Sequence, residues 1–317
     1  MPAAGKLRPG HQSRTSIPVS AGHFRLPRDS MKRSSLFVLF VLSAGAGISA
    51  PTPTSASATT RTAEEECNLG AFYSDGKQVP IDLPQAFAWW KLSAEHGCAE
   101  AQYNVGSCYD AGSGVAEDKI AAARWFRKSA ESGFAEAQLV TGLNYDMGVG
   151  VEKDAGKAMV WYLAAAKQGN LDAQAALGCG FLDGNGAPRS PDEAVKWFTL
   201  AADHGHAAAQ YALGCCYFEG TGVVSNRPTA VKWWLLAAQG GIAAAQHKMG
   251  ALYLRGDQVP LDLVKARAWF CVAVLSGDKS ALNNLVETSA KLTSAQVEES
   301  DSVAKTYAAL AMPRSKN

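Results

Sequence analysis

The chain has 317 residues, with 30 Lys and Arg against 29 Asp and Glu, and 47% of it is hydrophobic. This apolar fraction excludes a disordered or collagen-like chain. Residues 51–317 hold 23 basic and 28 acidic residues, and this mildly acidic balance excludes a general nucleic-acid binder, which needs a basic face. The 7 cysteines are too few for a small disulfide scaffold, and their odd number leaves at least one free thiol.

The first fifty residues predict an export signal. Lys32 and Arg33 precede an apolar run at 36–42, which is followed by small residues at 43–50. This order is typical of a signal peptide, and the run is short for a membrane span. We therefore expect a signal peptide at 31–50, cleaved near Gly47 or Pro51, and a periplasmic or secreted product. An uncleaved N-terminal anchor is the alternative.

The segments on either side of the signal resemble no domain. Residues 1–30 have no recognisable pattern, and translation could instead begin at Met31. Residues 51–64 are almost entirely Thr, Ser, Pro and Ala, a composition that predicts a disordered linker.

Self-comparison shows one unit repeated six times, at residues 65–280, with a period of 36 residues and no insertion between copies. A fixed period of this length indicates a solenoid. Two columns carry the period most clearly. The glycine column is Gly70, Gly106, Gly142, Gly178, Gly214 and Gly250, and the tryptophan column is Trp89, Trp125, Trp161, Trp197, Trp233 and Trp269.

Each repeat is expected to form two helices, A and B. In the second copy, Ala101, Val105 and Tyr109 share one face of helix A, and a glycine-rich turn at 112–115 ends it. Helix B follows a column of short side-chain acceptors suited to capping a helix N-terminus. The members of this column are Asp82, Asp118, Asp154, Ser190, Asn226 and Asp262.

The glycine column predicts close packing of the two helices. A glycine inside a helix costs up to about 1 kcal/mol relative to alanine, so Gly106 needs a packing reason. We expect it to let helix B approach, with the tryptophan column filling the adjacent space. On this interpretation, Trp161→Ala should destabilise the protein much more than Trp90→Ala. Stacked pairs then form an all-α solenoid with a right-handed superhelix.

The repeat consensus resembles the Sel-one-like repeat, a relative of the tetratricopeptide repeat. The shared pattern is Ala-x3-Leu-Gly-x2-Tyr-x2-Gly-x-Gly-Val-x2-Asp-x3-Ala-x2-Trp-x4-Ala-x2-Gly. Departures are local, such as Gln78 and Gln258 at the second loop glycine. The resemblance implies an adaptor that binds other proteins and has no chemistry of its own.

Two further capping signals are present. In the fourth repeat Ser190, with Pro191 and Glu193, predicts a capping box with a proline at the first helical position. Residues 281–317 close the array: residues 281–285 begin a seventh helix A, and Thr293 with Gln296 predicts another capping box. That box should open a polar-faced capping helix that ends near residue 310.

Three patterns suggest chemistry, and each has a simpler explanation. Gly-x-Gly turns such as 112–114 superficially resemble phosphate loops, but they recur as a structural turn and no strand precedes them. Ser-x-x-Lys occurs at 74–77, 276–279 and 302–305 without its companion motifs, so β-lactam binding or hydrolysis stays an alternative that a chromogenic β-lactam would test. His204 and His206 offer only two of the three or four ligands that a metal needs.

One cysteine pair is a candidate disulfide. Cys67 lies near the start of helix A in the first repeat, and Cys98 lies just past the end of its helix B. Antiparallel packing brings these two ends together. Other cysteines, such as Cys108 and Cys271, fit packing positions.

The predicted working surface is the concave face, which helix A lines in tetratricopeptide-like arrays. Its non-core columns are acidic in the N-terminal half and apolar in the C-terminal half. The alternative to a binding groove is a solvated acidic face beside tighter packing on the cap, which would give the same pattern. The candidate groove residues are Glu100, Tyr103, Asp110, Glu136, Asp146, Tyr211, Phe218, His247 and Leu254.

We therefore expect an exported, non-catalytic scaffold, monomeric, that binds protein or peptide partners. We expect no cofactor, no metal, no nucleic-acid partner and no stable membrane insertion after signal cleavage. A cell-envelope assembly scaffold is a further alternative. The sequence does not name the partner.

Overall fold

A computed structural model describes residues 61–76 and 79–311. The predicted signal peptide and residues 51–60 of the predicted linker lie outside these ranges. Within these ranges every regular element is a helix. Consecutive helices pack as pairs, as the 36-residue period predicts. The helices are α1 (Ala63–Asp75), α2 (Leu83–Glu95), α3 (Ala99–Ala111), α4 (Lys119–Glu131), α5 (Ala135–Met147), α6 (Ala155–Lys167), α7 (Leu171–Asp183), α8 (Pro191–Asp203), α9 (Ala207–Glu219), α10 (Arg227–Gln239), α11 (Ala243–Arg255), α12 (Leu263–Leu275), α13 (Ala281–Ser289) and α14 (Ser294–Ala311).

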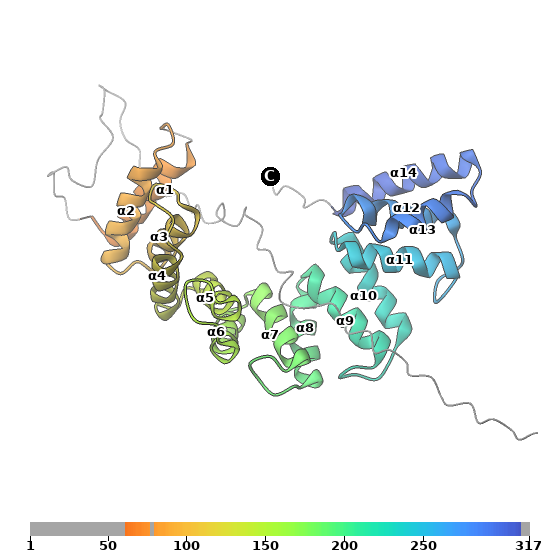
Figure 1. Cartoon of the computed structure of the whole chain (residues 1–317), viewed down its shortest axis with the longest axis horizontal. Helices are drawn as coiled ribbons and strands as arrows, with labels where there is room; N and C mark the ends of the chain where they lie inside the picture. Colours follow the sequence, from red (N-terminus) through yellow and green to blue (C-terminus); the bar gives the residue numbers. More distant parts are fainter. Residues whose placement is uncertain (1–60, 77–78, 312–317) are drawn as a thin grey trace, which may run out of the picture.

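The helix pairs follow an arc, and α1, α3 and α5 lie on its inner side relative to α2, α4 and α6 (Figure 1). The first helix begins two residues before the predicted start of the repeats, because Thr62 and Glu65 form a capping box that the sequence analysis missed. None of the described helices is long and apolar enough to cross a bilayer.

The predicted N-cap column is confirmed as the start of every helix B. Asp82, Asp118, Asp154, Asn226 and Asp262 each accept a backbone N–H from the first turn. Ser190 is also the N-cap residue, with Pro191 at the first helical position, but its side chain accepts no capping bond. The predicted capping box is wrong here because Glu193 binds Lys196 instead, at 2.6 Å.

The glycine column does let helix B approach, but the tryptophans are not the side chains that use the space. A Cβ added at Gly106 would lie 2.8 Å from the ring of Phe126, which follows Trp125. The same holds in every repeat, so the packing partners form a second aromatic column: Trp90, Phe126, Tyr162, Phe198, Trp234 and Phe270.

The tryptophan column lies beside the preceding repeat. Trp125, Trp161, Trp197 and Trp233 are half-buried, whereas Trp89 and Trp269 at the two ends are buried. Trp197, for example, packs against the cluster that holds Leu139, Leu143 and Tyr162 of the third repeat. The interpretation that the tryptophan column fills the space beside the glycines is therefore wrong, and Trp90, which lies outside that column, has its ring directly on Gly70.

A buried glutamine column joins neighbouring repeats. Each glutamine donates its Nε2 to the carbonyl of an alanine eight residues earlier, near the end of the preceding helix B, at 3.1–3.2 Å. The column is Gln102, Gln138, Gln174, Gln210 and Gln246. Directional hydrogen bonds between buried groups therefore hold the repeats in register alongside apolar packing.

The loop glycines have a structural role. Gly186 has φ +77°, and a Cβ there would overlap with the carbonyl of Ala155 in the preceding repeat. This close approach explains the Gly-x-Gly turns without a phosphate. Gln258 replaces the second loop glycine in the last repeat and still adopts the left-handed conformation, with φ +63°. Gln78 lies outside the described residues.

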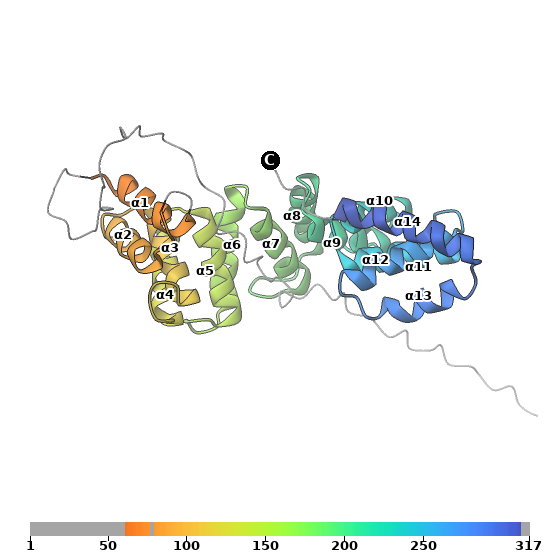
Figure 2. The same ribbon diagram turned by 90° about the horizontal axis from the view of Figure 1, so that it is seen from above.

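The C-terminal end is closed as predicted. The seventh helix A is α13, and α14 opens with the Thr293–Gln296 capping box. Both helices contact α12, and they lie on opposite sides of it (Figure 2). Tyr307 of α14 stacks on Trp269 with ring centroids 4.0 Å apart, and the mostly buried Arg267 binds Asp301 at 2.6 Å.

Candidate functional site

The nine predicted groove residues do not form one open surface. Glu136 is exposed, whereas Glu100, Tyr103, Asp110, Phe218, His247 and Leu254 are half-buried. Asp146 and Tyr211 are buried, with 8% and 9% of their surface exposed. Asp146 and Tyr211 therefore do not lie on an open surface as predicted.

Several of these side chains are engaged within the protein. Asp110 binds Lys119 at 3.0 Å, and the ring of Phe218 lies under the guanidinium of Arg227. The imidazole of His247 binds Asp278 at 2.8 Å, so it joins α11 to the start of the C-terminal cap and does not face solvent freely.

One acidic column does run along the helices on the inner side of the arc. Its members occupy the second position of α1, α3, α5 and α7, and we call them the acidic ridge: Glu64, Glu100, Glu136 and Asp172. The pKa of Glu100 is raised above its ordinary value, first by burial and then by the charges of Cys98, Glu136 and Glu64. The carboxylates of Glu64 and Glu136 are therefore close enough to repel that of Glu100.

Tyr103 lies next to the ridge. Its ring packs against Phe126 and Phe134, with centroids 5.4 Å away in both cases. Burial raises the pKa of its hydroxyl, and the charge of Glu136 raises it further.

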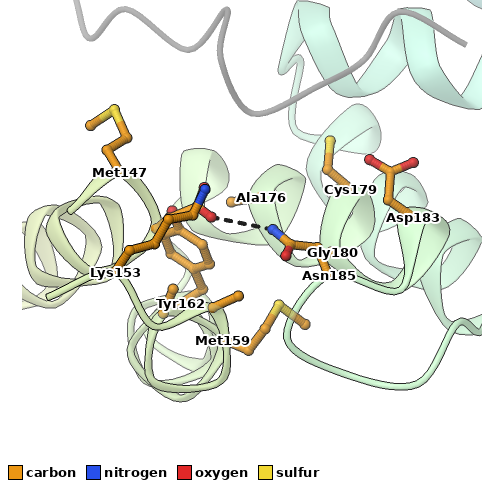
Figure 3. Close-up of a pocket in the computed structure, with 12 residues that line it drawn as sticks. Met147, Lys153, Met159, Tyr162, Ala176, Cys179, Gly180, Asp183 and Asn185 are labelled. Carbon is orange, nitrogen blue, oxygen red and sulfur yellow. Dashed lines mark hydrogen bonds between the residues drawn. The ribbon is translucent and has the colours of Figure 1, made fainter.

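A pocket of about 430 Å³ lies between α5, α6 and α7, and Figure 3 shows the side chains around it. Its walls are formed by Met147, Met159, Tyr162 and small residues of α6 and α7. Asp146 accepts a hydrogen bond there from Nδ2 of Asn185, at 3.2 Å, drawn as the dashed line in the figure.

Among the predicted groove residues, only Asp146 lines this pocket. Sequence analysis does not identify Tyr162, Met159 and Asn185, because they belong to helix B and to a loop, nor Met147, the last residue of α5, because the predicted groove columns do not include its position. A usable signal exists in the sequence. Where the second repeat has Asp110 and Lys119, the third has Asp146 and Ala155, so the compensating charge is missing.

Cys67 and Cys98 are free thiols joined by a side-chain hydrogen bond. Cys98 is the N-cap residue of α3. The hydrogen bond from Cys67 lowers the pKa of Cys98 to about 5, with further help from the N–H groups of Ala101 and Glu100, although burial opposes the shift. The predicted proximity of the two cysteines is thus present.

The remaining candidate patterns are dispersed. His206 caps α9 through Nδ1, and its Nε2 binds Asp172 at 3.0 Å, whereas His204 binds the carbonyl of Leu200. Across 61–76 and 79–311 no cluster of His, Cys, Asp and Glu is suited to a metal ion. Of the Ser-x-x-Lys matches, Ser276 and Ser302 are exposed in separate helical contexts, and Lys77 lies outside the described residues.

The paired helices, the period and the capped end define the class as an α-solenoid repeat scaffold. The model of the Sel1 repeat matches residues 66–98, 99–134, 135–170, 171–206, 207–242 and 243–278. The chain therefore belongs to the Sel1 repeat family.

One solved structure agrees with this assignment, and two others are less similar. A Sel1 repeat protein from Oxalobacter formigenes is 30% identical, with a TM-score of 0.62 over 67% of this chain and 85% of the other. A protective antigen of uropathogenic Escherichia coli is 22% identical, covers 77% and 84% of the two chains, and has a TM-score of 0.40.

An immunity protein from Pseudomonas aeruginosa is 18% identical, covers 71% and 86%, and has a TM-score of 0.41. The search of curated proteins found no match.

Proposed function

We propose that the protein is an exported, non-catalytic scaffold that binds a protein partner through the inner face of its superhelix. The observation that carries this proposal is the acidic ridge. The partner it suits has a basic segment that lies along α1, α3, α5 and α7, because a row of carboxylates repels itself until a cation neutralises it.

Helix dipoles alone do not account for the ridge. A carboxylate in the first turn of a helix is favoured by the dipole, and that effect is the same for every helix A. The equivalent positions in the fifth and sixth repeats are Ala208 and Ala244. Because the acidic residues stop after the fourth repeat, they mark one half of the array rather than a general helix preference.

A pull-down with the mature chain as bait would supply the partner, and surface plasmon resonance at two ionic strengths would test the ridge. Reversing Glu64, Glu100 and Glu136 to lysine should slow association and remove its salt dependence, because surface charges act mainly on the association rate. Reversing Glu298 and Glu299, exposed on α14, is the matched control. Equal binding by both variants and the parent would place the partner on the convex face or the loops.

Export is the second part of the proposal and rests on the segment 31–50. The expected product begins near Gly47 or Pro51 and accumulates in the periplasm or the medium. N-terminal sequencing of secreted material measures this directly. A cytosolic product that retains residues 1–50 would contradict it.

In an oxidising compartment, the contact between Cys67 and Cys98 would favour a disulfide. The lowered pKa of Cys98 makes it the thiolate partner. Alkylation of the unreduced secreted protein followed by peptide mass spectrometry should find these two cysteines linked. Cys108 and Cys179, which are buried in α3 and α7, should stay free and serve as the internal comparison.

A further inference from the structure

The first residue of helix B supplies a cation to the end of its own helix A in the second repeat. Lys119 opens α4, nine residues after Asp110. Its Nζ donates to the backbone carbonyl of Asp110 and also to Oδ1, at 3.0 Å. The hydrogen bond to Asp110 is the main cause of the raised pKa of Lys119, so the ammonium is stabilised there.

The fifth repeat places an arginine at the equivalent position. Arg227 opens α10 nine residues after Phe218, and its guanidinium carbon lies 5.0 Å from the centroid of that ring. Its Nη1 is 3.8 Å from Oδ2 of Asp257, in the loop of the following repeat. This place in the repeat therefore accepts a guanidinium between the end of helix A and the next loop.

The third repeat again has a carboxylate near the end of helix A, as the second repeat does, but the residue that opens its helix B is not a cation. The equivalents of Phe218, Arg227 and Asp257 are Asp146, Ala155 and Asn185. Ala155 is the smallest residue in its column, and Gly180 is the smallest in another that lines the same space. The pocket of about 430 Å³ lies where these side chains are missing, and its size is within the range of sites that bind ligands.

The pocket holds buried polar groups that need a partner. Asp146 is 8% exposed, and its one hydrogen bond, from Asn185, is to a neutral amide. Tyr162 is 4% exposed, and its buried hydroxyl has no hydrogen-bond partner among residues 61–76 and 79–311. Its neighbour is the carboxylate of Asp146, whose charge contributes to the raised pKa of the hydroxyl after burial. An unpaired buried hydroxyl is destabilising, and a ligand that hydrogen-bonds to it would remove that cost.

We propose that this pocket binds the guanidinium side chain of an arginine on the protein partner. The guanidinium donates to Asp146 and to the oxygen of Tyr162, and the aliphatic stem lies against Met159. Arginine suits the site better than lysine because its fork of donors can reach two oxygens at once. This inference rests on the proposed function, since it names the residue by which a basic partner would be held.

The probe for the test is N-acetyl-L-arginine amide, added to the full-length protein labelled with carbon-13 on its methionine methyls. The NMR signals of Met147 and Met159, which line the pocket, should shift on titration. That of Met249, buried in α11, should stay unchanged as the internal control. The neutral isostere N-acetyl-citrulline amide should produce no shift, and the lysine amide should bind more weakly.

Three variants make the test specific. Asp146→Asn should weaken binding at least about tenfold, the effect of losing a hydrogen bond to a charged group. Asp110→Asn, at the equivalent position where Lys119 already fills the site, should leave the affinity unchanged. Ala155→Lys should abolish the shifts by supplying the intramolecular cation, without lowering the melting temperature, so loss of binding is not confused with loss of fold.

Lys153 is an exposed residue at the rim, and its removal tests a competing occupant. If arginine amide binds only in the Lys153→Ala variant, the chain's own lysine fills the site and the proposal is overturned. Equal binding by the parent and Asp146→Asn also overturns it. Either of these results overturns the arginine pocket but leaves the proposed scaffold function standing, provided that a partner binds through the acidic ridge. Conversely, if arginine amide binds but no partner is captured, the scaffold function is contradicted and the pocket is not.

Discussion

Two aromatic columns run side by side along the B helices, and they differ in what they contact. The tryptophan column keeps the same residue in all six repeats, yet its inner members are half-buried beside the preceding repeat. The second aromatic column varies between Trp, Phe and Tyr, and its rings lie on the helix-A glycines. A position that holds the same residue in all six repeats is therefore not necessarily the most buried one. The most buried aromatic position is the one that faces a glycine on helix A.

The largest effect should come from emptying the second column. Phe198 is 1% exposed and lies on Gly178, so Phe198→Ala should cost about 3–5 kcal/mol of unfolding free energy. Trp197→Ala, at the neighbouring half-buried position, should cost clearly less. Thermal and urea denaturation followed by circular dichroism would measure both. Equal losses would mean that the two columns share the core evenly.

The second largest effect tests whether the missing side chain at Gly178 is what allows Phe198 to be buried. Gly178→Ala would place a methyl group into the ring of Phe198, and overpacking of this kind costs about 1–3 kcal/mol. Gly156→Ala is the matched control, because it is an exposed position of α6 whose nearest neighbour for a Cβ is 3.4 Å away. There the helix propensity of alanine should slightly raise the melting temperature. A neutral Gly178→Ala would show that the ring moves aside.

A third change should convert a buried tryptophan into a half-buried one. Trp269 is 1% exposed and is stacked on by Tyr307 of α14. Tyr307→Ala should cost about 2 kcal/mol, from lost burial and stacking, and shift tryptophan emission to longer wavelength. Tyr307→Phe keeps the ring and should change neither quantity. If the alanine variant leaves the emission unchanged, the cap does not determine the burial of this column.

The smallest effect on stability is expected from Glu100, a residue of helix A that belongs to neither aromatic column. The pKa of Glu100 is raised, so the native state holds that proton more tightly than the unfolded chain does. Glu100 therefore opposes folding above its native pKa, and this penalty fades as pH falls toward the ordinary value of 4.5. Glu100→Gln should raise the melting temperature slightly at pH 7 and leave it unchanged near pH 4. Glu152→Gln, in an exposed loop, should show no such dependence.

The sequence predicts the architecture because its signals are local and recur. The glycine column and the N-cap column mark the helices six times over, so no single exception, such as Ser190, changes the assignment. The orientation of helix B is harder to predict. Trp125 and Phe126 are adjacent and differ by about 100° around the helix, and both are apolar enough for the core. Only the facing helix decides which of them lies on Gly106.

The candidate site was predictable only in part. The acidic ridge follows from spacing along helix A, because four helices begin in the same way. The pocket depends on a side chain that is absent: Ala155 is unremarkable unless it is compared with Lys119 and Arg227 at the same position in other repeats. Within the described part of the chain, the hydroxyl of Tyr162 is left without a hydrogen bond because of the distances between atoms in the folded chain. Such distances cannot be obtained by comparing repeats in the sequence.

The glutamine column has a consequence for how such an array can change its length. Every interior glutamine meets the same carbonyl, so a whole unit of 36 residues could be deleted or duplicated and the new junction would still close. The first repeat is different. It has Glu66 at this position, 4% exposed and bound to His96 of its own repeat at 2.7 Å. Placed inside the array, that carboxylate would face a carbonyl oxygen, so the chain can gain or lose middle units while its first unit must remain first.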